Sequence, residues 1–283
     1  MVNYIKKIKK IKINFLDIDE KKIIGYRDPV LLIGYDKVKI NYHHKLYFNV
    51  RYNDDDKIKT HVFCAPFKNL DTINAKKINF CKQSEINYFA CGSSIYKNNK
   101  IYIFYSKDTS KSFYYSVSHN GFDFYNETQI NFENNFRPRL IGLPYYFEFN
   151  KRKFLIFEGL DKFYSIYIYQ INSDLKKMKF VKRISIPNKS LANPSIIIRN
   201  NKIFLFYNMA EKNLRFRLCY AQLTKNFLLN TKFKFLINSD FLKYYRIEGF
   251  RYFQNSGLFF ALQNKDPYKG GKIFYGKLLF KME

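Results

Sequence analysis

Charged and polar side chains open several aromatic-rich segments of this chain, and their types suit an oxygen-rich anionic ligand. Guanidinium groups form paired hydrogen bonds with carboxylates and phosphates. Several arginines at one place therefore predict a site for an acidic sugar, a sugar phosphate or a nucleotide sugar. The alternative is that the arginines pair with Asp28, Glu158 and Glu248 as a structural network. The openings hold Arg27 and Asp28, Cys91 and Ser93, Arg137 and Arg139, Asn193, and Glu248 with Arg251.

The segments that must position these residues form a repeat. Each copy has an opening strand, a short polar turn, an aromatic-rich strand, a second turn and a third strand. Asn98-Asn99 and Asn200-Asn201 supply residues that tolerate positive φ in tight hairpins. The opening landmarks are 46 to 64 residues apart, which suits a propeller blade better than a helical repeat. They are Asp28, Gly92, Pro138, Pro194 and Gly249.

The pattern predicts an all-β fold, a five-bladed β-propeller. We expect one domain over residues 1–283, with blades at about 26–80, 90–130, 136–185, 192–236 and 246–280. Each face of a blade must be covered by the next blade, so the aromatic content of 20% is expected to be mostly structural. Residues 5–16 are predicted to close the ring by completing the last blade, and the alternative is a basic surface arm.

Composition limits the functional classes. The net charge of +27, from 50 Lys and Arg against 23 Asp and Glu, favours a polyanionic partner. We do not expect nucleic acid, because the lysines are spread evenly and no recognised motif is present. Transient contact with an anionic membrane surface is compatible with the charge. Part of the Lys, Asn, Ile, Phe and Tyr excess also reflects A/T-rich codons.

Cysteines and histidines give no sign of a metal or cofactor. Four cysteines without metal-ligand spacing predict reduced thiols, and the N-terminal segment lacks the apolar run of an export signal, so we expect a cytoplasmic protein. Cys91 is expected to be a core thiol rather than a nucleophile. His43-His44, His61 and His119 lack the spacing of ligands, and Asp54-Asp55-Asp56 is predicted to be a solvated turn rather than a calcium site.

Four elements in order carry a resemblance to a family group. They are Tyr26-Arg27-Asp28-Pro29, the segment from Gly92 to Ser106, Ser118-His119-Asn120-Gly121-Phe122-Asp123-Phe124, and Asn193-Pro194-Ser195-Ile196-Ile197. Together they resemble the five-bladed propellers of glycoside hydrolase families 43, 32 and 130, over nearly the whole chain. The order and spacing of these motifs carry the likeness.

The resemblance implies roles for individual residues. In families 43 and 32 an Asp on the first innermost strand is the base or nucleophile, and Asp28 matches it. An Asp opening the third blade and a Glu opening the fourth are replaced by Arg137-Pro138-Arg139 and Asn193. Hydrolysis of a glycosidic bond uses two carboxyl groups, so Glu248 and Glu158 are the substitute candidates. Asp28 could instead cap a turn or pair with Arg27.

Three hypotheses follow from these residues. The first is a carbohydrate-active enzyme acting on an anionic or phosphorylated glycan, with Asp28, Glu248 and Glu158 as catalytic candidates. Its substrate-binding candidates are Arg27, Arg137, Arg139, Asn193, Arg251, Ser93 and Tyr26. The second is a transferase that assembles a surface polysaccharide, and the third is a propeller that binds an acidic glycan without turnover. Without Trp, aromatic platforms for sugar would come from Tyr26, Tyr145, Tyr146, Tyr244 or Tyr245.

Overall fold

The structure is a computed structural model. It describes residues 4–33, 44–67, 71–80, 88–107, 112–133, 137–210, 216–230, 233–235, 246–253, 257–263 and 271–279. For 4–8, 216, 235, 246–253, 257–263 and 276–279 it describes the backbone. In these ranges the chain is almost entirely β-strand, with one short 3-10 helix, η1 (Glu20–Lys22). None of the described helices is long and apolar enough to cross a bilayer.

Antiparallel pairing groups the described strands into successive sheets. The first sheet holds β3 (Ile23–Ile33), β4 (His44–Asp54), β5 (Lys57–Phe67) and β6 (Thr72–Lys77). The second holds β8 (Phe89–Lys97), β9 (Lys100–Lys107), β10 (Phe113–Ser118) and β11 (Asp123–Phe132). Short β2 (Lys12–Phe15) and β7 (Asn79–Phe80) run parallel to the outer strands β6 and β11.

The later sheets follow the same order. The third holds β12 (Leu140–Ile141), β13 (Tyr145–Phe149), β14 (Arg152–Leu160), β15 (Tyr164–Ile171) and β16 (Lys177–Ile184). The fourth holds β17 (Ser190–Arg199), β18 (Lys202–Ala210), β19 (Phe216–Leu223) and β20 (Lys234–Phe235). The fifth holds β21 (Arg246–Phe253), β22 (Gly257–Gln263), β23 (Gly271–Leu279) and β1 (Tyr4–Lys10).

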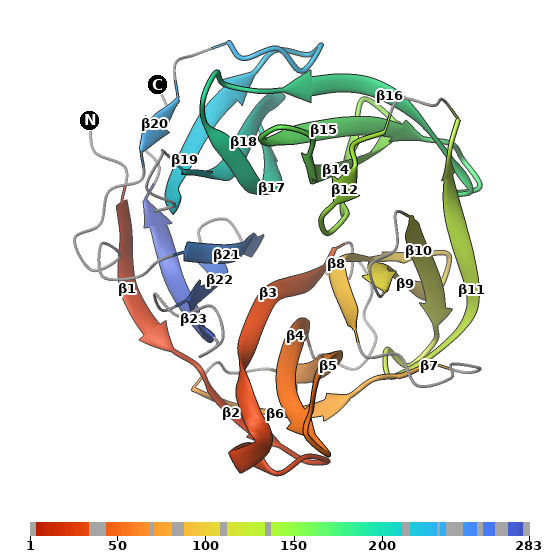
Figure 1. Cartoon of the computed structure of the whole chain (residues 1–283), viewed down its shortest axis with the longest axis vertical. Coiled ribbons are helices and arrows are strands. Elements are labelled where there is room, and N and C mark those ends of the chain that lie inside the picture. Colours follow the sequence, from red (N-terminus) through yellow and green to blue (C-terminus); the bar gives the residue numbers. More distant parts are fainter. Residues whose placement is uncertain are drawn as a thin grey trace.

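The sheets stand side by side around a ring (Figure 1). The first strands β3, β8, β12, β17 and β21 lie nearest its centre, and the outer strands form the rim. β1 pairs antiparallel with β23, so strands from both ends of the chain share one sheet. This radial arrangement of antiparallel sheets is that of a β-propeller. It brings the first strand of every sheet toward one axis.

Hairpin turns use the residues that the sequence indicated. Asn98 and Asn99 have φ of 50° and 58°, and Asn200 and Asn201 have φ of 49° and 57°. This left-handed conformation is required by the tightest hairpins, and Asn tolerates it well. The predicted Asp-rich tip at 54–56 is also such a turn, with Asp55 and Asp56 exposed and at positive φ.

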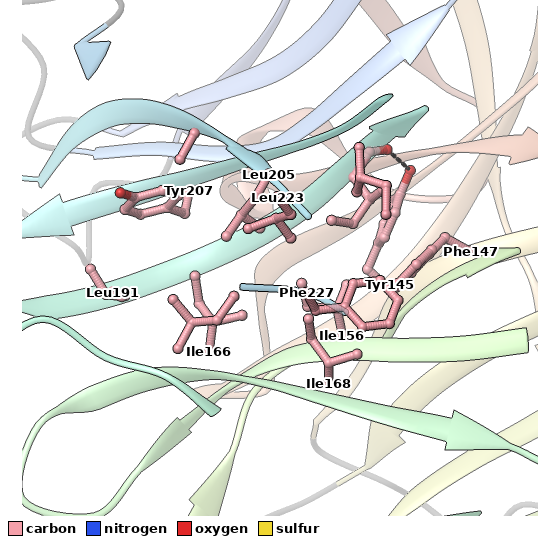
Figure 2. Close-up of a cluster of buried hydrophobic side chains, with 14 of the residues drawn as sticks. Tyr145, Phe147, Ile156, Ile166, Ile168, Leu191, Leu205, Tyr207, Leu223 and Phe227 are labelled. Carbon is pink, nitrogen blue, oxygen red and sulfur yellow. Dashed lines mark hydrogen bonds between the residues drawn. The ribbon is translucent and has the colours of Figure 1, made fainter. Parts of the chain in front are cut away.

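Hydrophobic clusters fill the spaces between neighbouring sheets. The cluster between the third and fourth sheets includes Tyr145, Ile166, Leu205 and Phe227 (Figure 2). Similar clusters join the second sheet to the third and the first to the second. The largest fully buried side chains of the described residues are all Tyr or Phe, so most of the aromatic content is structural, as predicted.

Candidate active site

The first strands share a backbone irregularity near the axis. Their pairing register shifts between Arg27 and Val30, Cys91 and Ser93, Ala192 and Ser195, and Glu248 and Arg251. In the third sheet the same place is the break between β12 and β13, from Ile141 to Tyr145. Bulges redirect side chains and are frequent beside active sites. The shared irregularity marks a ring of corresponding positions around the axis.

Asp28 occupies the bulge of the first sheet and is held from its buried side. Its φ is 45°, an uncommon conformation for a residue with a side chain. Nδ2 of Asn49 on β4 donates to Oδ2 of Asp28 at 3.2 Å and to the carbonyl oxygen of Cys91 at 3.2 Å. Oδ1 of Asn49 accepts the Cys91 N–H at 2.9 Å. Asn49 therefore fixes the Asp28 carboxylate and joins the first sheet to the second.

Glu158 makes a corresponding contact between the third and fourth sheets. It is half-buried on β14, and its Oε2 accepts the backbone N–H of Asn193 at 2.5 Å. A Cβ atom on Gly142 would lie 2.4 Å from Cγ of Glu158, so the side chain fills the space left by this glycine. A donated N–H stabilises the charge of a carboxylate. This suits a residue that orients or stabilises better than a proton donor.

Asn193 repeats the backbone geometry of Asp28. Both residues lie in a first-strand bulge, both precede proline, and their φ values are 50° and 45°. The fourth sheet thus carries an amide where the first carries a carboxylate. The carboxyl of Glu158 nevertheless lies against this position, because it binds the Asn193 N–H. The structure therefore brings together the predicted residues Glu158 and Asn193.

The register assigned to the third repeat from sequence was wrong. The bulge equivalent to Asp28 lies at 142–144, and Arg137 and Arg139 precede β12. The physical reason is that Pro138 packs against Gly159 of β14 and does not open a bulge. A Cβ atom built on Gly159 would lie 2.5 Å from Cγ of Pro138. Arg137 and Arg139 are exposed and lie just before β12, not at this bulge. Arg27 is half-buried on β3 beside Asp28.

Ser93 is a structural residue, which corrects its prediction as a substrate contact. It is 1% exposed, its Oγ donates to the Pro144 carbonyl at 2.9 Å, and it accepts the Tyr146 N–H at 2.9 Å. Gly92 beside it has no room for a side chain, since a Cβ would lie 2.3 Å from the Pro144 carbonyl oxygen. These contacts use the proton and one lone pair of the Ser93 hydroxyl, and they join the second and third sheets.

Three of the five tyrosines predicted as sugar platforms lie in the described residues, and each contacts its neighbours in the fold. Tyr26 lies 5.6 Å from the Phe15 ring and 6.1 Å from the Phe48 ring, and burial raises its pKa, with Glu20 adding to the effect. Tyr145 donates to the Ile196 carbonyl at 3.2 Å, as the dashed line in Figure 2 shows. Tyr146 is 2% exposed. Tyr145 and Tyr146 are buried, so the platform prediction was wrong for these two rings. Tyr26 is half-buried, and its role as a substrate contact stays a prediction.

The remaining predictions concern the fifth sheet and the metal ligands. Backbone pairing places Glu248 and Arg251 at the two ends of the β21 bulge, and their side chains lie outside the described residues, as do Tyr244 and Tyr245. Cys64, Cys91 and Cys219 are buried free thiols. Among the side chains that the structure describes, no group of three or more His, Cys, Asp or Glu could hold a metal ion.

Sequence reasoning missed Asn49, the residue that holds Asp28. The sequence feature that could have identified Asn49 is its place as the one amide in the run from Leu46 to Val50. The other four residues of this run are large hydrophobic or aromatic residues, and all four are fully buried. A buried amide needs hydrogen-bond partners, and those partners lie on other strands. Its position in an otherwise apolar strand could have marked it as a site residue.

Comparison with known proteins agrees with the propeller geometry. No family model matches the chain, and no curated protein matches its sequence. Solved structures do match. A thermostable family-43 glycoside hydrolase has a TM-score of 0.65 and 13% identity, over 91% of this chain and 90% of that one. The chain therefore has the β-propeller fold of that structure.

Two other solved propellers are similar. A GH32 beta-fructofuranosidase from Bombyx mori has a TM-score of 0.61 and 12% identity, over 96% of this chain. The match spans 61% of the Bombyx mori chain, less than two thirds of its length. A mannose phosphorylase from Leishmania mexicana, solved with a phosphate ion, has a TM-score of 0.59 and 10% identity, over 96% of this chain and 88% of that one. The resemblance to families 43 and 32 is thus confirmed at the level of fold.

Proposed function

We propose that this protein is a carbohydrate-active enzyme that acts on an anionic or phosphorylated glycan at the axis of its propeller. In this proposal the five sheets are the five blades of a single domain over residues 1–283. The observation that carries it is Asp28, a carboxylate held in a left-handed bulge on the innermost strand by a buried amide. Strained backbone at an inward-facing polar residue is a frequent mark of a catalytic group.

The chemistry follows from the contacts of the two described carboxylates. Asp28 accepts an N–H from Asn49, which favours its charged form and suits a base. As base, Asp28 takes a proton from water while the water oxygen bonds to the anomeric carbon, and an acid protonates the leaving oxygen. Glu158 accepts an N–H as well, so it suits charge stabilisation better. Glu248 on the adjacent fifth sheet is the proposed acid.

Arginines on or just before the first strands support an anionic substrate. Arg27 lies beside Asp28, and Arg137 and Arg139 are exposed before β12. Their planar groups match carboxylate and phosphate oxygens. The phosphate ion in the similar mannose phosphorylase is in accord with this proposal. The buried free thiols support a reducing compartment, so we propose a cytoplasmic location.

A second candidate is a propeller that binds an acidic glycan without turnover. Two observations favour it. The fourth sheet has an amide, Asn193, at the position of a carboxylate, and the Glu158 carboxylate already accepts the Asn193 N–H. A transferase in surface-polysaccharide assembly would use the same arginines for a donor phosphate.

The test is a thermal-shift screen against acidic glycans, sugar phosphates and nucleotide sugars, followed by turnover assays on any stabilising ligand. Asp28→Asn is the decisive variant, because Asn193 shows that Asn adopts the same bulge. For an enzyme we expect Asp28→Asn to bind the ligand and to lose about a thousandfold in kcat. Arg137→Ala should weaken binding of the anionic ligand. Full turnover by Asp28→Asn would overturn the catalytic proposal, and binding without turnover by the wild type would favour the second candidate.

A further inference from the structure

The turn between the first and second strands carries basic residues in three successive sheets. In the second and fourth sheets these turns lie at 97–100 and 199–202, and the equivalent turn of the third sheet, at 150–153, joins β13, which follows β12, to β14. The cations on them are Lys97 and Lys100, Arg152 and Lys153, and Arg199 and Lys202. We call this set the hairpin face. It lies at the carboxyl ends of the first strands, whereas the bulges with Gly92 and Asn193 lie toward the amino ends.

Neighbouring turns bring like charges together. Lys153 lies beside Lys97 of the adjacent sheet, and burial, followed by the contact with Lys97, lowers the pKa of Lys153. Its Nζ donates to the Ser173 carbonyl at 2.9 Å, and Glu148 and Asp174 oppose part of the repulsion. Adjacent ammonium groups repel each other, so a nearby anion would stabilise this arrangement.

The same face displays apolar side chains beside its cations. Leu228 and Leu229 are 47% and 41% exposed in the turn after β19, next to Lys225. Ile198, which is 38% exposed, precedes Arg199. Pairing of Ile203 with both Ile198 and Leu223 places the two turns at one end of the fourth sheet.

Hydrogen bonds and a buried phenylalanine hold the turn that carries Leu228 and Leu229. Thr224 N–H donates to the Leu228 carbonyl at 2.8 Å, and its Oγ1 accepts the Leu228 N–H at 3.1 Å. Phe227 has a φ of 59° and is buried 5.0 Å from the Phe154 ring of the third sheet. A phenylalanine in this conformation is strained. The burial of the Phe227 ring offsets this strain, and the turn keeps both leucines exposed to solvent.

We propose that the hairpin face docks onto an anionic lipid membrane, with Leu228, Leu229 and Ile198 entering the interface between the basic hairpins. Cations attract anionic headgroups, and exposed aliphatic side chains gain free energy by leaving water. Nucleic acid fits less well, because proteins that bind single strands present aromatic rings for stacking rather than leucines. Docking by this face would leave the bulges and Asp28 directed away from the bilayer. The proposal is independent of the catalytic one.

Vesicle co-sedimentation tests the proposal with the full chain. Phosphatidylcholine vesicles, with and without phosphatidylglycerol, are compared at low and physiological salt. We expect binding that requires phosphatidylglycerol and weakens with salt. Arg152→Gln with Arg199→Gln should lower the partition coefficient about thirtyfold. Leu228→Ser with Leu229→Ser should lower it about tenfold.

Matched controls lie elsewhere on the molecule. Lys12→Gln with Lys76→Gln removes the same charge from the outer strands β2 and β6, and Leu140→Ser removes a leucine that is 43% exposed at the other end of the third sheet. Both controls should bind like the wild type, and circular dichroism melts show whether each variant is folded. Equal losses in the controls would overturn the proposal. So would wild-type binding that ignores phosphatidylglycerol, or binding to polyuridylate but not to vesicles.

Discussion

At the scale of single residues, Asn49 links the candidate site to the stability of the fold. Its amide contacts both Asp28 and the backbone of Cys91. Asn49→Ala removes these hydrogen bonds and leaves buried backbone groups of Cys91 without them, so we expect a loss of about 2 to 3 kcal/mol in the free energy of unfolding. Urea denaturation measures it. Asn14→Ala, which removes an exposed amide pair with Asn74, is the control and should change little. An unchanged urea midpoint for Asn49→Ala would contradict the linkage.

His61 predicts a specific pH dependence of stability. Burial, with repulsion from Lys77 and Lys59, lowers its pKa to about 4 from an ordinary value of 6.5. The unfolded chain therefore binds more protons between these values, and stability falls as pH drops from about 6.5 to about 4. We expect His61 to account for about 2 to 3 kcal/mol of this fall.

The measurement is the urea midpoint against pH for wild type and His61→Phe. The phenyl ring keeps the stacking on Phe89, whose centroid is 6.2 Å away, and cannot be protonated. The variant should lose most of the pH dependence in this window. His119→Gln, at an exposed position, should keep it. Parallel curves for wild type and His61→Phe would show that His61 is not the titrating group.

At the scale of elements, the second strand of each sheet was more predictable than the outer strand. Strands such as β9 and β18 are rich in Ile, Phe and Tyr because both faces of a blade are covered, and the sequence shows this directly. Outer strands such as β6, with sequence TINAKK, alternate weakly and were not assigned individually. The sequence also did not predict β13. β13 continues the direction of β12 after a break that contains Pro144, and a proline is not expected inside a strand. Corrected to Gly142, the landmarks are spaced 50 to 64 residues apart.

Site residues could be predicted from sequence only where the chemical type of the side chain is enough to suggest its role. Asp28 could be chosen because it matches a carboxylate of the similar families, and Glu158 because glycoside hydrolysis needs a second carboxyl group. Ser93 and Tyr26 were chosen for polarity and position along the strand. Whether such a side chain faces the axis or a neighbouring sheet depends on the bulge, which shifts the alternation by one residue. Position along the strand therefore could not decide their roles.

Contact between sheets gives a prediction at the element scale. Gly92→Ala would place a Cβ 2.3 Å from the Pro144 carbonyl oxygen, and backbone cannot yield as a side-chain tip can. We expect a loss of at least about 3 kcal/mol in stability, or failure to fold. Ser94→Ala on the same strand removes one hydrogen bond, to the Leu31 carbonyl, and should cost about 1 kcal/mol. Thermal melts distinguish the two. A melting temperature for Gly92→Ala equal to that of Ser94→Ala would mean that the second and third sheets are not in tight contact.

At the scale of the whole molecule, the net charge of +27 opposes the compact state. Like charges also meet where β1 pairs with β23. Lys10 on β1 contacts Lys272 on β23, and this contact is the main cause that lowers the pKa of Lys10. Added salt shortens the Debye length from about 30 Å at 0.01 M to about 8 Å at 0.15 M and so screens repulsion between exposed charges. We therefore expect sodium chloride to stabilise the fold.

The melting temperature should rise by about 5 °C over this range of salt, since each kcal/mol shifts it by a few degrees in a chain of this size. Lys10→Gln removes one member of the closing pair, so it should raise the melting temperature at low salt and flatten its dependence on salt. Lys57→Gln, at an exposed position on β5, is the matched control and should leave the salt slope near that of the wild type. A melting temperature that is constant or falls with salt would show that the excess charge is already balanced within the native ring.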